Sequence, residues 1–270
     1  MFKNIYPLFE EKRLLTKEML ENLRDYPRSI TDQIFSDFAN GILSGCNIMW
    51  DQEVLTVGPG MVCWKGMLYV MEEAASVACG PRDSVRYLKI QFMENSQEPG
   101  KVIGRGKIVL EEKEVDLESE MELGRFRLQK GARLRCKHEN FEDYSTRFDT
   151  VDQIDTPYGA KEKSTMKPEM LMQYAKELLK TGTSNPLDLI FAMNLLNQNG
   201  QVSMEGILAY IEGWIGGEDG EKVYKANTDK KISRQRTVYE SLLKILKEQR
   251  LGTVAQEGEA GRRNRKILLL

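Results

Sequence analysis

The stretch from residue 41 to residue 73 constrains the fold more than any other, because its apolar residues come in short runs separated by turn residues. The separators are Gly45, Asp51-Gln52, Gly58-Pro59-Gly60 and Lys65-Gly66. Glycine supplies the positive-φ backbone that tight turns need, and proline presets φ at the first corner of a turn. The pattern therefore predicts four short strands in a meander, over residues 47–50, 54–57, 61–64 and 68–71.

A second strand signal follows the meander. Residues 85–93 alternate, with Leu88 and Ile90 on one side and Lys89 and Gln91 on the other, which is the period of a half-buried strand. Residues 101–110 and 122–128 carry similar patterns. We therefore expect residues 41–148 to form one antiparallel β domain, a barrel or a sandwich of roughly six to eight strands.

Helical signals lie on both sides of this β region. In the segment 1–40, Thr16 can cap a short helix that Pro27 ends, and a second helix can begin near Ser29. Residues 149–166 are polar and predict a linker. From 167 to 270 the apolar period is helical, with starts at Pro168, at Asn185-Pro186, at Ser203 and at Ser233. The expected fold class is α+β, with a β domain followed by a helical domain.

The order of elements after Asn185 is typical of a winged helix-turn-helix domain. The long last helix would take the recognition position, and residues 251–256 and 265–270 would pair as the wing hairpin. The last fifty residues hold 13 Lys/Arg against 6 Asp/Glu, so this part carries an excess of positive charge. Cations so placed neutralise phosphates. The candidate nucleic-acid-binding residues are Arg234, Arg236, Lys244 and Lys247 on the helix, and Arg262, Arg263, Arg265 and Lys266 at the wing.

A second interpretation of this basic surface stays open. Basic residues on an amphipathic helix commonly form only its solvated face, and winged-helix folds also serve as protein-interaction modules. Glu240 and Glu248 on the same helix would repel duplex DNA. The sequence therefore predicts contact with nucleic acid, contact with protein, or plain packing for this surface.

No motif for catalysis stands out. There is no GxxxxGK[ST] loop, because Gly106-Lys107 lacks a glycine five residues before Gly106, so nucleotide hydrolysis is not expected. His138 is the only histidine; with Cys136 it supplies two metal ligands, whereas structural zinc usually takes four. We expect no enzyme activity, no cofactor, no metal and no small-molecule substrate. A pair of carboxylates that meet only in space stays open as an active site.

Composition and cysteine use indicate a cytoplasmic protein. Apolar residues make up 41% of the chain and charged residues 30%, and no run approaches the roughly 18 apolar residues of a membrane span. The first fifteen residues lack the apolar core of a signal peptide. The four cysteines form no CxxC pair, and we expect them to be reduced.

The glycine-rich stretch also carries a resemblance. The segment GILSGCNIM…LTVGPGMVCWKGMLYVMEE resembles the N-terminal modules of phage tail, baseplate or fibre-attachment proteins. Over its whole length, including ELGRFRLQKGARLR, HENFEDY and RKILLL, the chain is similar to an uncharacterised bacterial family whose members have at times been labelled helicases. The positions that match the tail modules, and would form their turn or docking motif, are Gly41, Gly45, Pro59, Gly60 and Gly66.

This resemblance implies a structural or assembly component of a phage-tail-like particle. Its partners would be other tail or baseplate-like proteins or further copies of itself, and its place would be the cytoplasm or the particle. The alternative function is that of a nucleic-acid-binding protein that uses the C-terminal winged helix.

Overall fold

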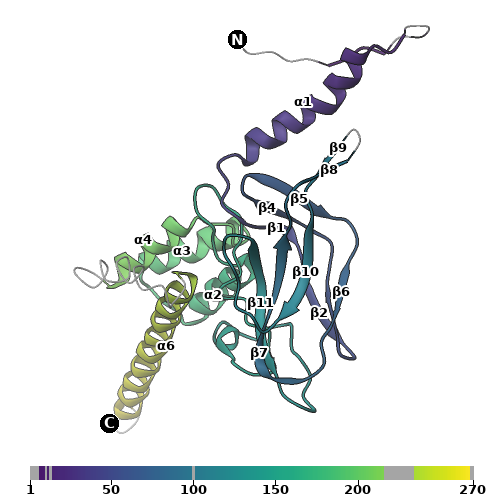
Figure 1. The fold of residues 1–270 in the computed structure, drawn as a ribbon. Coiled ribbons are helices and arrows are strands. Elements are labelled where there is room, and N and C mark those ends of the chain that lie inside the picture. Colours follow the sequence, from purple (N-terminus) through teal and green to yellow (C-terminus); the bar gives the residue numbers. More distant parts are fainter. Residues whose placement is uncertain (1–5, 10, 12–13, 99–100, 216–233, 268–270) are drawn as a thin grey trace.

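The computed structural model describes residues 6–9, 11, 14–98, 101–215 and 234–267, with side chains for all of these except 98, 101, 215, 234 and 253–267. The fold is mixed α+β, as the sequence predicts. Figure 1 shows the strands gathered in one body, the C-terminal helices to one side of it, and the N-terminal helix projecting away from the strands.

The N-terminal helix α1 (Lys17–Phe35) is a single helix rather than the two short helices predicted. Thr16 caps it as predicted, since its Oγ1 accepts a hydrogen bond from Met19 N at 3.3 Å. Pro27 lies inside the helix and does not end it. Hydroxyl groups satisfy nearby carbonyls: Ser29 Oγ donates to Asp25 O at 2.8 Å, and Thr31 Oγ1 donates to Pro27 O at 2.9 Å. The carbonyl that Pro27 leaves without an N–H partner is that of Leu23, four residues earlier, and α1 is exposed there.

Eleven strands in the described residues form four small antiparallel sheets, and none of these sheets closes into a barrel. The orders are β1-β4-β5, β2-β3-β6, β10-β7-β11 and β8-β9. The bounds are β1 (Gly41–Gly45), β2 (Ile48–Asp51), β3 (Val54–Val57), β4 (Gly60–Trp64), β5 (Met67–Met71), β6 (Ala75–Ala78), β7 (Arg82–Phe92), β8 (Ser96–Glu98), β9 (Lys101–Ile103), β10 (Gly106–Glu111) and β11 (Glu120–Leu128).

The predicted meander is wrong in its pairing, although its four strands exist. β2 pairs with β3 and β4 pairs with β5, but β3 and β4 belong to different sheets. The chain crosses between the sheets at Gly58-Pro59, where Gly58 N donates to Asn47 O at 2.8 Å and Pro59 O accepts from Cys46 N at 3.0 Å. β4 then pairs with β1, an element that the sequence pattern did not predict.

The helical part contains α2 (Pro168–Lys180), α3 (Pro186–Asn197), α4 (Met204–Ile215), α6 (Arg234–Ile267) and a short 3-10 helix (Glu142–Ser145). Two predicted caps are confirmed: Leu187 N donates to Asn185 Oδ1 at 3.1 Å, and Gly206 N donates to Ser203 Oγ at 3.2 Å. The predicted cap Ser233 lies outside the described residues.

The winged-helix prediction is not confirmed. Residues 251–267 continue α6, so a hairpin over this part of the chain is wrong, and residues 268–270 lie outside the described ranges. Residues 257–264, rich in glycine and charge, predict a turn between the two wing strands, but α6 runs through Gly258 and Gly261 to Ile267.

Two apolar clusters hold the described chain together, one between the sheets and one among the helices. Residues between β11 and α2 contribute to both. Leu134 and Val151 pack into the sheet cluster, while Phe141, Ile154 and Met166 pack into the helical cluster. This segment joins the two cores, and the domain division at residues 41, 149 and 167 stays a prediction.

Candidate functional site

Arg236 of α6, a predicted nucleic-acid contact, lies in an acidic pocket inside the protein. Its Nη2 donates to Asp152 Oδ2 and to Asp155 Oδ2, both at 2.7 Å. Asp155 also lies 3.0 Å from Arg125 of β11, and Arg125 donates to the buried Glu122 at 2.7 and 2.6 Å. Burial opposes the charge, but the two aspartates raise the pKa of Arg236. This guanidinium therefore joins α6 to the β body and does not face a phosphate.

The other predicted basic residues do not form one surface in the described structure. Lys247 Nζ lies 2.6 Å from Glu142 Oε1, so it bridges α6 to the 3-10 helix. Lys244 is exposed, and the described residues give it no ion-pair partner. The side chains of Arg234, Arg262, Arg263, Arg265 and Lys266 lie outside the described structure, and their role stays a prediction.

The glycines of the turn motif are placed where the backbone needs them. Gly45 pairs with Gly60 across β1 and β4 at a φ of +67°, and a Cβ there would overlap Pro59 O. A Cβ on Gly60 would lie 2.5 Å from Cys46 N, and one on Gly41 would overlap the backbone of Gly159. Gly66 has a φ of +73° and open space around it, so only its conformation requires glycine.

His138 and the cysteines have structural surroundings. The ring of His138 stacks on Tyr144 with centroids 3.8 Å apart, and its Nε2 lies 2.9 Å from Val151 O. Burial lowers the pKa of His138 to about 4. Burial also raises the pKa of Cys46 and Cys136 to about 11, which disfavours their thiolates at neutral pH. The described residues include no group of three or more His, Cys, Asp or Glu placed to hold a metal.

A buried carboxylate lies among the helices. Asp188 of α3 is fully buried and accepts hydrogen bonds from Thr183, Tyr210, Trp214 and Gln249 at 2.5–3.0 Å. Every one of these donors is a neutral side chain. Because the carboxylate is enclosed and satisfied, it ties α3 to α4 and α6 rather than facing a substrate.

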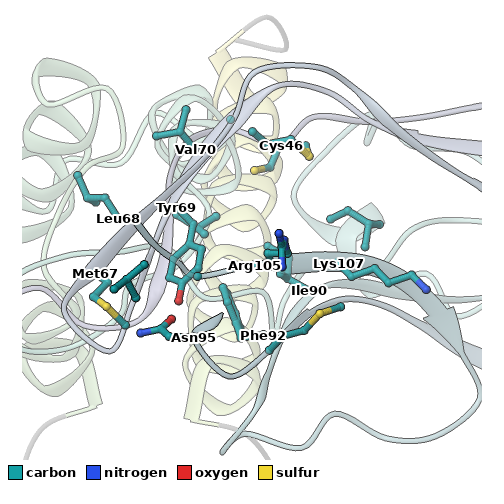
Figure 2. Close-up of a pocket in the computed structure, with 18 of the residues that line it drawn as sticks. Cys46, Met67, Leu68, Tyr69, Val70, Ile90, Phe92, Asn95, Arg105 and Lys107 are labelled. Carbon is teal, nitrogen blue, oxygen red and sulfur yellow. The ribbon is translucent and has the colours of Figure 1, made fainter. Parts of the chain in front are cut away.

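A cleft of about 770 Å³ opens beside α1. Figure 2 shows Tyr69, Val70, Phe92 and Asn95 around it, with Lys107 at its side. The wall includes Tyr69 and Phe92, whose rings meet edge-on at 5.0 Å, and the buried Trp64 stacks on Phe92 at 4.3 Å. Several segments line it: α1 (Arg28, Thr31, Asp32), the residue after β1 (Cys46), β4 (Gly60, Val62), β5 (Met67–Met71), β7 and the residue after it (Ile90, Phe92, Met93), and residues 95, 102 and 104–108.

The cleft runs along the edges of two sheets. Five consecutive residues of β5 line it, and so do the five consecutive residues 104–108. Successive side chains of a strand point to opposite faces, so a cavity that touches all of them lies along the edge of the strand. β5 is an outer strand of its sheet, and β10 is an outer strand of another.

Polar groups sit at the mouth of this cleft. In the described structure, neither the hydroxyl of Tyr69 nor the side chain of Asn95 has a hydrogen-bond partner. A Cβ on Gly104 would lie 2.9 Å from Tyr69 Oη and 2.9 Å from Asn95 Oδ1, so glycine keeps the mouth open. The charged lining residues are Arg28, Arg105 and Lys107, against the single acid Asp32.

Helix α1 borders this cleft and carries an uncovered apolar stripe. The stripe consists of Leu20, Leu23, Pro27, Ile30 and Ile34, which follow one another at spacings of three, four, three and four residues. Its four aliphatic side chains are 43% to 56% exposed, and no residue of α1 is buried. Such spacing places side chains on one face of a helix, as in helices that pack on a second helix.

Comparison with known proteins gives no match to any family model, to any curated protein or to any solved structure. In the described residues, no helix is both long and apolar enough to cross a membrane. The candidate site therefore rests on geometry: the α1 stripe and the adjoining cleft. The sequence does not predict the cleft, because its walls come from segments distant in the chain. The two short helices expected on either side of Pro27 would have separated the residues of the stripe.

Proposed function

We propose that this protein is a non-enzymatic assembly component that docks onto neighbouring subunits through α1. The observation that carries the proposal is the exposed stripe of α1. None of the 19 residues of α1 is buried, and its contact with the body is a small one with β5, so the helix draws little tertiary stability from the body it is attached to. Packing against a second helix would supply that stability.

The size of the stripe suits a docking contact that works together with others. Its four aliphatic side chains are each about half exposed. Burying the exposed half of each contributes roughly 1 kcal/mol, or about 4 kcal/mol for the four before the entropic cost of association. One helix pair of this size gives weak binding by itself, which fits a subunit that is held by several neighbours in a particle.

The resemblance of residues 41–73 to phage tail and baseplate modules names the kind of particle. We propose that the partners are other tail or baseplate-like proteins or further copies of this chain. The glycines of the turn motif then serve to shape the β body that carries α1, since Gly41, Gly45 and Gly60 are each packed against backbone.

The nucleic-acid alternative has less support. Two of its helix residues, Arg236 and Lys247, are engaged with Asp152, Asp155 and Glu142. The winged-helix architecture that would present the remaining residues would need a hairpin where α6 continues. This alternative still rests on the basic residues near the end of α6, which are Arg262, Arg263, Arg265 and Lys266.

Sedimentation velocity on the full chain tests the docking proposal. We expect concentration-dependent association in the wild type and its loss in Leu20→Glu/Ile30→Glu, which places two charges on the stripe. The matched control is Asn22→Glu/Gln33→Glu, which adds the same charges to α1 away from the stripe. If the wild type binds no copy of itself, the test is co-purification of candidate tail proteins with the two variants. We then expect the control variant to retain the partner and the stripe variant to lose it. Equal association of the two variants would contradict the proposal.

A further inference from the structure

We propose that the cleft between β5 and β10 binds an extended segment, Tyr6–Phe9, from a second copy of this chain. This inference deepens the proposed docking function, on which it rests, by naming a second contact between copies. The segment would lie as an added strand along the exposed sheet edges.

The first step is that the cleft is shaped for a strand. Among the described strands, β5 pairs with β4 alone and β10 pairs with β7 alone, so each has an outer edge whose backbone N–H and C=O groups are not used in a sheet. An edge strand of this kind is a template for another chain. A compact ligand would touch one face of a strand, whereas this cleft follows five consecutive residues on each side.

The second step is that the chain carries an apolar segment without cover. Tyr6, Leu8 and Phe9 are 57% to 70% exposed in the described structure. The cleft wall that would receive them contains Phe92, Ile90 and Met71. Covering both surfaces at once removes apolar area from water on each side of the contact.

Charge favours one orientation of the bound segment in the cleft. Glu10 and Glu11 follow Phe9 in the sequence. The cleft carries Arg28, Arg105 and Lys107 against the acid Asp32, which pairs with Arg28 at 3.8 Å, so its net charge is positive. Acidic residues next to the apolar segment would therefore meet a surface of opposite sign, which favours one register over its alternatives.

The source is a second copy because of how α1 is placed. Arg28 lies at the cleft, and Thr16, which follows the segment, is twelve residues earlier on the helix, or about 18 Å away at 1.5 Å per residue. α1 projects from the body, so it carries the segment away from its own cleft (Figure 1). Pro7 has no N–H, so we expect full backbone pairing with only one of the two edges.

A labelled peptide tests the inference directly. The probe is a peptide with the sequence of residues 1–15 and a fluorophore at its C-terminus. The receptor is the full chain with Leu8→Asp/Phe9→Asp, in which the segment can no longer occupy a cleft. We expect saturable binding by anisotropy, and binding about tenfold weaker when Glu10 and Glu11 of the peptide are replaced by lysine.

A glycine substitution tests the place of binding. Gly104→Leu, added to the receptor, fills the mouth of the cleft against the movable ends of Tyr69 and Asn95, and we expect it to abolish peptide binding. Gly252→Leu in α6 is the matched control, because an added Cβ there meets nothing within 4 Å. Thermal melts of both confirm that each chain folds. Equal peptide binding by the two variants, or no binding to the receptor, would overturn the inference.

Sedimentation separates this inference from the docking function. Loss of association in the α1 stripe variant, with no peptide binding, would leave the docking function standing and reject the cleft contact. If the peptide binds and the stripe variant Leu20→Glu/Ile30→Glu associates as strongly as the wild type, the cleft contact is supported and docking through the α1 stripe is rejected. Peptide binding together with a wild type that stays monomeric would place the segment in its own cleft and overturn the second-copy assignment.

Discussion

Arg236 and Asp155 form a contact of 2.7 Å between the last helix and the segment that precedes the helical part. The same carboxylate lies 3.0 Å from Arg125 of β11 and is only 5% exposed. One aspartate thus joins an arginine of the β body to an arginine of α6. The two apolar cores are held together at this point by charge as well as by packing.

Removing Arg236 should destabilise the fold. Arg236→Ala leaves the carboxylates of Asp152 and Asp155 with one cation fewer in a largely buried place. We expect a loss of about 3 kcal/mol in the free energy of unfolding, measured by urea denaturation. Lys244→Ala on the exposed face of the same helix is the control and should change stability by less than about 0.5 kcal/mol. Similar effects of the two substitutions would show that the network contributes little.

The single histidine should give the protein a defined pH dependence. Its folded-state pKa of about 4 lies below the ordinary value, so the folded protein prefers neutral His138. The stabilisation is complete above the unfolded pKa of about 6.5 and is lost as pH falls from there toward 4. Allowing for the partial exposure of the ring, we expect about 2 kcal/mol less stability at about pH 4.5 than at pH 7 from this group.

His138→Phe is the variant that isolates this effect. It keeps a ring for stacking on Tyr144 and removes the titrating group. Its free energy of unfolding, measured by urea denaturation across the same pH range, should fall less steeply than that of the wild type. Parallel curves for the two proteins would assign the acid sensitivity to the carboxylates instead.

The glycines of the turn motif should prove to be structural. Gly60→Ala places a Cβ 2.5 Å from Cys46 N, so β1 and β4 must separate, and we expect a loss of more than about 2 kcal/mol. Gly66→Ala meets open space, and its positive φ should cost only about 1 kcal/mol. Thermal unfolding of both variants gives the comparison. A larger loss in Gly66→Ala than in Gly60→Ala would contradict this ranking.

Local signals predicted local structure well, and the sequence did not specify how distant segments meet. Asn185 and Ser203 begin helices because a cap acts within three residues. Pro27 does not end α1, because on an exposed helix water can satisfy the one carbonyl, that of Leu23, that loses its N–H partner. The pairing of β4 with β1 depends on a crossing at Gly58-Pro59 that strand patterns do not encode.

The site shows the same limit. Helical periodicity places Arg236 beside the apolar face of α6, but its partners lie about eighty residues earlier in the chain, so the pattern could not separate an internal ion pair from a phosphate contact. The cleft combines residues of α1, β5 and 104–108, which no spacing rule links. The stripe of α1 is visible in the sequence, but only the structure shows that nothing covers it.

Replacing the carboxylate of Asp188 by an amide should destabilise the folded protein. Four neutral donors converge on it, from Thr183, Tyr210, Trp214 and Gln249. Asp188→Asn exchanges one acceptor oxygen for a donor, so the charge is lost and Thr183 and Gln249, which share Oδ2, must reverse their hydrogen bonds to accept from the new NH2 group. We expect a loss of about 3 kcal/mol in the free energy of unfolding. The measurement is urea denaturation monitored by tryptophan fluorescence, to which Trp214 contributes. Glu212→Gln, at an exposed position of α4, is the matched control and should be nearly neutral. If Asp188→Asn were equally neutral, the four hydrogen bonds to the carboxylate would not be what stabilises this part of the fold.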